Sequence, residues 1–150
     1  MLAPPSAVWL PPGLIHAAPA PCTITTLLGS CVAVCLWSAV PRVGGMNHFL
    51  LPRAAQREGS PRYGDTAMAL LLSRMSVLGG SDLVARIYGG AAVAGLGTMR
   101  LGEQNVELAR RWLHDQRIPV IDEDVFGLAA RRIVLDVASG DVAISEVGGA

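Results

Sequence analysis

Cys31 and His48 are the residues of this sequence whose types and spacing fit covalent chemistry. Cys31 follows Gly29 and Ser30 between two apolar segments, so we expect it on a tight turn at the edge of a strand. His48 lies on the segment that we expect to form the neighbouring strand. If the two segments pair, the imidazole reaches the thiol, lowers its pKa and serves as acid and base. Backbone N–H groups near Ser30 and Cys31 would then stabilise an oxyanion.

Other interpretations of the same residues remain open from the pattern alone. A free cysteine is more often a small buried apolar residue, and a strand histidine is more often structural. A zinc site is a further alternative, because four side chains offer three sulfurs and one nitrogen: Cys22, Cys31, Cys35 and His48. The residues between Cys31 and Cys35 favour a strand, however, and zinc knuckles place their cysteines on a turn. We therefore expect no metal.

Cofactor motifs are also missing from the glycine-rich stretch 89–102. Arg100 stands where a dinucleotide fingerprint that begins at Gly95 and Gly97 needs a third glycine. The chain contains no lysine, which excludes a Walker-type phosphate loop and a Schiff base. No cofactor is expected.

Composition restricts the class of protein and its partners. The chain has 150 residues, the size of one domain, and 51% of them are apolar, which argues against a disordered chain. The net charge is zero, and the longest basic runs are the pairs Arg110–Arg111 and Arg131–Arg132, which we expect on solvated faces; nucleic acid is therefore not an expected partner. Three cysteines make a poor disulfide framework and indicate a reducing, cytoplasmic setting. No apolar run approaches the ~20 residues of a membrane span, so no membrane insertion is expected.

The expected elements are arranged around the proposed site. Residues 1–11 form an extended, proline-rich lead-in, and residues 12–150 form a single domain. Apolar periodicity and turn residues predict strands at 23–28, 31–37, 43–51, 83–88 and 118–121, helices at 65–78 and 103–116, and a hairpin over 133–147. The two faces of the strand at 31–37 should carry Val32, Val34 and Leu36 on one side and Ala33 and Cys35 on the other. This order predicts a mixed fold (α+β or α/β), a layered β-sandwich flanked by two main helices.

Several motifs follow one another in a distinctive order. The first are Thr25–Leu36 and Gly44–Pro52, and further ones are Tyr63–Met68, Arg86–Ala91 and Leu101–Val106. Together they cover nearly the whole chain, and in this order they resemble the CheD family of chemoreceptor glutamine deamidases.

The resemblance implies roles for particular residues. Cys31 would be the nucleophile, His48 the histidine of the site, and Thr25, six residues before the cysteine, the third member that orients His48. The implied reaction converts receptor glutamines to glutamate. The implied fold is a layered sandwich like the catalytic domain of the cytotoxic necrotizing factor toxins. The implied partners are chemoreceptor cytoplasmic domains and, in some bacteria, the CheC phosphatase.

Two positions depart from the family's usual pattern. Phe126–Leu128 stands near a place where paired glycines are common, and Gln104 replaces an arginine. Neither change touches the proposed catalytic residues, but both bear on how a partner docks. A weakly catalytic adaptor and a receptor methylesterase are the alternative functions. The enzyme is favoured because Thr25, Cys31 and His48 are all present.

Overall fold

The computed structural model describes residues 5–56 and 59–148. These residues form two helices, α1 (Gly64–Val77) and α2 (Leu96–Asp115). They also form nine strands: β1 (Ser6–Trp9), β2 (Ile15–Pro19), β3 (Cys22–Leu28), β4 (Val32–Ser38), β5 (Val43–Asn47), β6 (Val84–Gly89), β7 (Val120–Val125), β8 (Ala130–Asp136) and β9 (Val142–Val147). Neither helix is long and apolar enough to cross a membrane, within the residues described.

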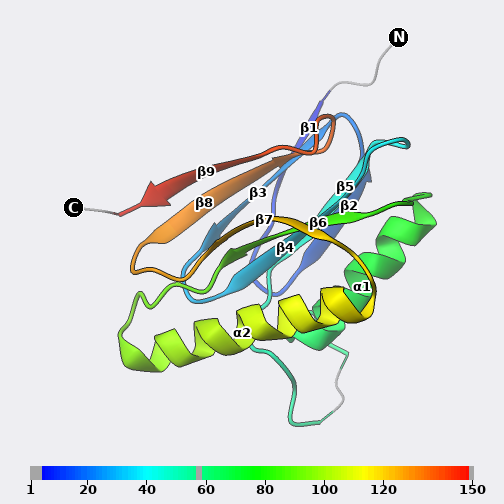
Figure 1. Ribbon diagram of the computed structural model, residues 1–150. Helices are drawn as coiled ribbons and strands as arrows, with labels where there is room; N and C mark the ends of the chain where they lie inside the picture. Colours follow the sequence, from blue (N-terminus) through cyan, green and yellow to red (C-terminus); the bar gives the residue numbers. More distant parts are fainter. Residues whose placement is uncertain (1–4, 57–58, 149–150) are drawn as a thin grey trace.

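The strands make two sheets that lie face to face. One has four strands in the order β1-β3-β8-β9, and the other has five in the order β2-β5-β4-β6-β7. The pairs β1–β3 and β6–β7 are parallel and the other pairs are antiparallel, so both sheets are mixed. Both helices pack on the five-stranded sheet, on the side away from the four-stranded one (Figure 1). The expected mixed α/β class with two main helices is confirmed.

Strand β4 lies at the centre of the five-stranded sheet and supplies side chains to two buried layers. Val32, Val34 and Leu36 pack among the residues that face the helices. Ala33 and Cys35 pack in a second cluster between the two sheets. The two-residue alternation read from the sequence is therefore confirmed, because both faces of this strand are covered.

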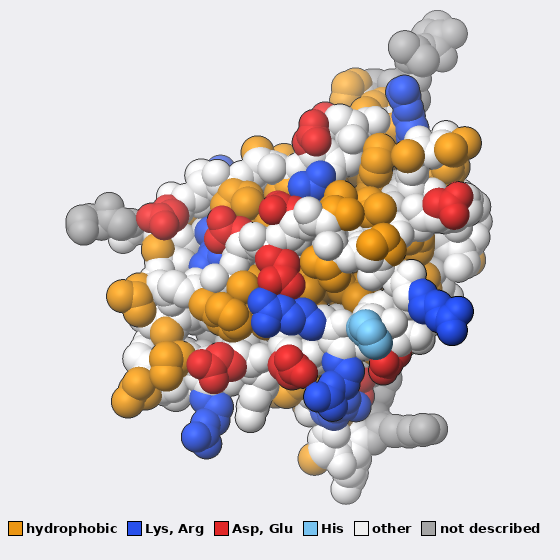
Figure 2. All heavy atoms as spheres, in the orientation of Figure 1, with side chains coloured by type: hydrophobic (Ala, Val, Ile, Leu, Met, Phe, Trp, Pro, Cys, Tyr) orange, Lys and Arg blue, Asp and Glu red, His pale blue; other side chains and the backbone are white. Residues whose placement is uncertain are grey.

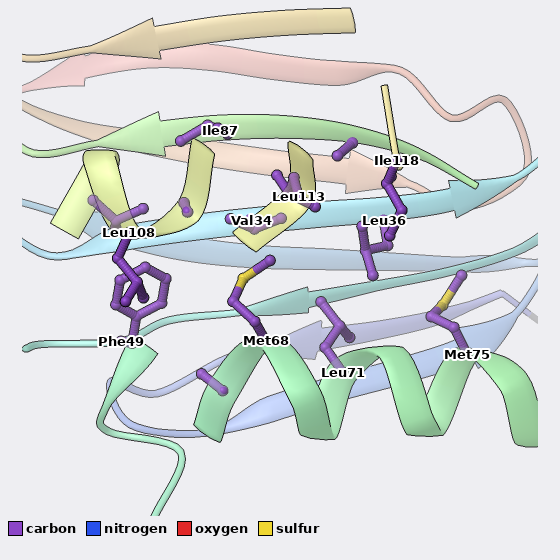
Figure 3. Packing of buried hydrophobic residues seen from close by; sticks show 14 of the residues in the cluster. Val34, Leu36, Phe49, Met68, Leu71, Met75, Ile87, Leu108, Leu113 and Ile118 are labelled. Carbon is purple, nitrogen blue, oxygen red and sulfur yellow. The ribbon is translucent and has the colours of Figure 1, made fainter. Parts of the chain in front are cut away.

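Helix α1 begins and ends within one residue of its predicted bounds. Its apolar side chains at three- and four-residue spacing, Met68, Leu71 and Met75, are fully buried. Figure 3 shows them pointing toward the sheet that carries Val34 and Leu36. The helix ends where Gly79 takes a φ of +82°, a conformation that glycine adopts without a steric cost.

Helix α2 is longer than expected. The prediction placed a glycine loop up to residue 102, whereas the helix begins at Leu96 and contains Gly97 and Gly102. Gly102 is needed because a side chain there would meet the backbone carbonyl of Gly90. The glycine that argued for a loop therefore permits close packing of helix against strand.

The N-terminal lead-in contributes more than an extended chain. Strand β1, in the described part of the lead-in (residues 5–11), pairs with β3, and β2, which follows the lead-in, pairs with β5. Each is an edge strand of its sheet. Leu10, between these strands, is 2% exposed. The C-terminal hairpin is confirmed as β8 and β9, but β7 extends to Val125 beyond its predicted end, and β5 ends at Asn47 before its predicted end.

The expectation that Arg131 is solvated is wrong. Its side chain is buried and bonds to the Asp124 carboxylate at 2.6 Å and to the backbone carbonyls of Asp124 and Phe126. A buried guanidinium is stable only with such partners, and here they fix the chain between β7 and β8.

Candidate active site

The register of β4 and β5 brings Cys31 and His48 to the same face of the sheet. Val32 and Phe49 form an antiparallel bridge, with N–H···O distances of 3.1 and 2.9 Å in the two directions. Continued along the strands, this register places Ala33 opposite His48, so that Cys31 and His48 are diagonal neighbours. Diagonal pairs have Cβ atoms about 7 Å apart, a gap that a thiol and an imidazole can bridge. The predicted pairing of the two residues is consistent with this register.

The turn that carries Cys31 is held by the end of β6. Gly90 donates its N–H to the Cys31 carbonyl at 2.9 Å, and Ala91 donates to the Gly29 carbonyl at 3.0 Å. Gly89 has a φ of +111°, and a side chain there would collide with the Cys31 carbonyl. This contact explains one glycine of the Gly89–Gly90 pair. Among the described residues, no backbone carbonyl accepts a hydrogen bond from the N–H groups of Ser30 and Cys31, and the backbone at Cys31 bonds to the Cys31 thiol instead.

His48 is held at its backbone and at its ring. It is 2% exposed. Its backbone N–H donates to the Leu14 carbonyl at 3.2 Å, and its carbonyl accepts from Gly13 at 2.7 Å. On the ring, Nδ1 lies 2.7 Å from Oγ1 of Thr26. The other nitrogen, Nε2, has no hydrogen-bond partner among the described residues and is the one left for Cys31.

The threonine whose hydroxyl contacts the His48 ring is Thr26, and not Thr25 as expected. Thr26 is fully buried, whereas Thr25 points to the outer face of the four-stranded sheet and lines a shallow pocket with Trp9 and Arg132. Successive strand residues face opposite sides, so a shift of one position exchanges the two faces. The sequence contains the signal that was missed, since Thr26 alternates in phase with the apolar residues Ile24 and Leu28.

Burial makes the resting pair neutral. It raises the pKa of the Cys31 thiol, an effect partly offset by a hydrogen bond from the backbone at Cys31. It also lowers the pKa of His48 from 6.5 to about 4. Both shifts favour the uncharged forms, so the expectation of a lowered thiol pKa is wrong. At neutral pH the site holds a thiol beside an imidazole that can accept its proton.

The other two cysteines lie in the layer between the sheets. Cys22 and Cys35 are each 2% exposed, and burial raises the pKa of Cys35 to about 12. In the described ranges 5–56 and 59–148, no group of three or more His, Cys, Asp or Glu side chains is placed to hold a metal ion.

Comparison with known proteins places the chain in a family. The family described as "CheD chemotactic sensory transduction" matches residues 50–146, which is more than half of the chain. The chain belongs to the CheD family. The match begins after His48 and does not cover Cys31 or His48.

Curated CheD proteins align over most of the chain. It is 47% identical to the probable chemoreceptor glutamine deamidase CheD 1 of Anaeromyxobacter dehalogenans, over 89% of this chain and 80% of the relative. It is 42% identical to the corresponding protein of Rhodospirillum rubrum, over 93% of this chain and 81% of the relative. An alignment that covers 89% of a 150-residue chain must include both Cys31 and His48.

Proposed function

We propose that this CheD protein is a chemoreceptor glutamine deamidase with Cys31 as its nucleophile. Membership of the CheD family and the names of its relatives, probable chemoreceptor glutamine deamidases, support the activity. The observation that carries the assignment of Cys31 is its position: a partly exposed thiol on a turn, on the same face of the sheet as a buried imidazole whose Nδ1 is already engaged. A nucleophile, a base and a group that orients the base are the parts that covalent acyl transfer requires.

The first half of the reaction forms a thioester. His48 takes the thiol proton at Nε2 while Sγ of Cys31 attacks the side-chain carbonyl carbon of a glutamine. The N–H groups of Ser30 and Cys31 stabilise the oxyanion, and Gly29 leaves room for the substrate beside them. His48, now an imidazolium, gives the proton to the amide nitrogen as the C–N bond breaks, and ammonia leaves.

The second half releases the product. A water molecule attacks the thioester carbon and gives a proton to His48. The C–S bond breaks, the proton returns to Sγ of Cys31, and the glutamine has become glutamate. The balance is one glutamine and one water converted to one glutamate and one ammonia, without a cofactor or a metal. The neutral resting pair suits this cycle because an unprotonated His48 is ready as a base at neutral pH.

We also propose the substrates, partner and location of the protein, and the known fold that it resembles. The substrates are cytoplasmic domains of chemoreceptors, the protein acts in the cytoplasm, and the CheC phosphatase is a candidate partner. The layered sandwich is proposed to share its plan with the catalytic domain of cytotoxic necrotizing factor toxins. The alternative functions are an adaptor that binds receptors or CheC, and a receptor methylesterase.

Mass spectrometry of a chemoreceptor cytoplasmic fragment tests the proposal. The fragment is incubated with the parent protein and, in parallel, with the Cys31→Ala variant. We expect glutamine-to-glutamate conversion with the parent alone. A methyl-esterified fragment serves as the second substrate, and faster loss of the ester than of the amide would favour the methylesterase. Equal conversion by both proteins would remove Cys31 from the mechanism, and binding without conversion would favour the adaptor.

A further inference from the structure

Three backbone groups of residues 10–14 bond to His48 or to the threonine that contacts its ring. We call residues 10–14 the N-terminal clamp. Its Leu14 carbonyl accepts from the His48 N–H, its Gly13 N–H donates to the His48 carbonyl, and its Leu10 carbonyl accepts from the Thr26 hydroxyl at 2.8 Å. The clamp therefore contacts both His48 and the threonine that bonds to its ring.

These contacts determine where the protons lie. The Thr26 hydroxyl has a single proton, and its oxygen lies 2.8 Å from the Leu10 carbonyl and 2.7 Å from Nδ1 of His48. A carbonyl can only accept, so the hydroxyl proton goes to Leu10. The remaining contact then requires Nδ1 to donate and the Thr26 oxygen to accept. Thr26 is 0% exposed and Leu10 is 2% exposed, so these partners are shielded from competition with bulk water.

We propose that the N-terminal clamp sets the tautomer of His48. By taking the Thr26 proton, the Leu10 carbonyl keeps the ring protonated at Nδ1 and unprotonated at Nε2. Its catalytic consequence rests on the proposed function, since only the Nε2 lone pair can take the Cys31 proton. Leu10 and Thr26 are thus positioning residues that act through His48, and strand β1, which leads into Leu10, is part of the active-site support.

Nitrogen NMR of the histidine side chains tests the tautomer without any reference to activity. At pH 7 the parent protein should show His48 protonated at Nδ1, with the signal assigned by its loss in His48→Gln. A parent ring protonated at Nε2 would overturn the proposal, because the Thr26 proton would then point to the imidazole.

Two variants of Thr26 connect the tautomer to the rate. Thr26→Val keeps the shape of the side chain and removes its oxygen, so Nδ1 loses its acceptor and the ring should shift toward the Nε2 tautomer. We expect kcat on a receptor fragment to fall about 100-fold with little change in KM. Thr26→Ser should restore both the tautomer and most of the rate. An unchanged tautomer in Thr26→Val contradicts the proposal even if the deamidase assignment is correct. If the parent protein has no deamidase activity but Thr26→Val still shifts the tautomer, the clamp is supported and only its catalytic consequence is lost.

A separate observation concerns exposed apolar side chains beside the Cys31 turn. We call Val93, Leu96, Met99 and Leu128 the apolar rim; they are 47%, 79%, 42% and 80% exposed. Figure 2 shows hydrophobic side chains gathered at the left of the view, where Figure 1 places the start of α2 and the loops after β6 and β7.

The apolar rim is joined to the Cys31 turn by direct contacts. Gly29 lies two residues before Cys31. A methyl group on Gly29 would be 3.2 Å from the Val93 side chain. Ala92 donates to the Gly127 carbonyl at 2.8 Å, which ties the loop of Val93 to that of Leu128. Arg131 in turn bonds to the carbonyl of Phe126. The rim therefore consists of the first turn of α2 and two anchored loops, and Val93 brings it against the turn that carries Cys31.

We propose that the apolar rim docks the apolar side chains of the chemoreceptor segment that carries the substrate glutamine. The proposal rests on the proposed function. A protein substrate that reaches Cys31 must pass the loops beside this cysteine. The rim offers the substrate uncharged apolar side chains that lose water readily on binding.

Binding measured without turnover tests the rim. In the Cys31→Ala background, Leu128→Asp should raise the Kd for a receptor cytoplasmic fragment about tenfold, because a carboxylate would be buried against apolar side chains. Val40→Asp is the matched control, since Val40 is 91% exposed and lies in the turn between β4 and β5. Equal affinities for both variants, or equal losses, would overturn the proposal. Because binding does not require chemistry, this result is independent of whether the parent deamidates the fragment.

Discussion

The two buried layers on either side of β4 differ in what their polar groups do. In the layer between sheet and helices, Asn47 accepts from the Val34 N–H at 2.8 Å, and Asn105 donates to the Leu50 carbonyl at 3.0 Å. Each amide satisfies a backbone group, although Oδ1 of Asn105 has no hydrogen-bond partner among the described residues. In the layer between the sheets, His48 and Thr26 bond to each other, and Nε2 of His48 is left without a protein partner among the described residues.

The two faces of β4 therefore have different roles: one contributes to stability and the other to the proposed chemistry. Side chains that β4 sends toward the helices fill an apolar layer, and their loss should weaken the fold. The opposite face ends in a thiol and an imidazole whose ionised forms are disfavoured by burial. That end contributes little apolar packing and carries the reactive groups, so changes there should affect the rate first.

The largest expected effect is the loss of the base. His48→Gln keeps a buried amide near Thr26 but cannot take a proton, so kcat/KM on a receptor fragment should fall about 10³- to 10⁴-fold. Circular dichroism and thermal unfolding of the variant serve as the control, and the cooperative transition should persist. If activity survived, the claim that the layer between the sheets carries the chemistry would fail.

Acidification should lower the free energy of unfolding, because the buried His48 imidazole is held in its neutral form. The pKa of His48 is about 4 in the folded protein and 6.5 for an exposed histidine. As pH falls through 6.5 the unfolded chain gains a proton that the folded chain does not, so stability decreases until about pH 4. The loss attributable to this group is about 3 kcal/mol at most. Urea unfolding across this range measures it, and His48→Gln should show a shallower slope. Equal slopes in both proteins would contradict the buried neutral imidazole.

A smaller effect distinguishes two glycines of the helix layer. Gly102→Ala should destabilise the protein by about 1–3 kcal/mol, since the new methyl group meets the Gly90 carbonyl. Gly97→Ala is the matched control in the same helix, where nothing lies within 4 Å, and it should stabilise by about 0.5–1 kcal/mol. Denaturant midpoints of the two variants provide the comparison. A similar shift in both would show that Gly102 is not needed for close packing.

Local pattern was enough to predict the parts of the fold whose residues alternate clearly. The two faces of β4, helix α1 and the C-terminal hairpin follow from apolar spacing and from the turn residues that flank it. The start of α2 was missed because glycine is a poor helix former, and Gly102 is needed for a tertiary contact with Gly90, directly after β6, that local pattern does not reveal. Strands β1 and β2 were missed because they are short, contain or adjoin prolines, and pair with segments further along the chain.

In the candidate active site, too, local pattern predicted some features and not others. The types and spacing of Cys31 and His48 are visible in the sequence. The choice between Thr25 and Thr26 depends on which face of β3 is buried, and resemblance to a family pattern placed it one residue early. The direction of the thiol pKa depends on burial, and the contribution of Leu10 is made by a backbone carbonyl. Neither can be read from residue types.

One matched pair of variants on β4 and its preceding turn tests the central claim most directly. Cys31→Ala and Leu36→Ala change residues on opposite faces, and each is measured for its unfolding free energy and for its rate on a receptor fragment. We expect Cys31→Ala to abolish conversion with little change in stability. Leu36 is fully buried, so Leu36→Ala should cost about 2–5 kcal/mol and retain the rate per folded molecule. Conversion that persists in Cys31→Ala, or is abolished in folded Leu36→Ala, would contradict the separation of chemistry from packing on the two faces.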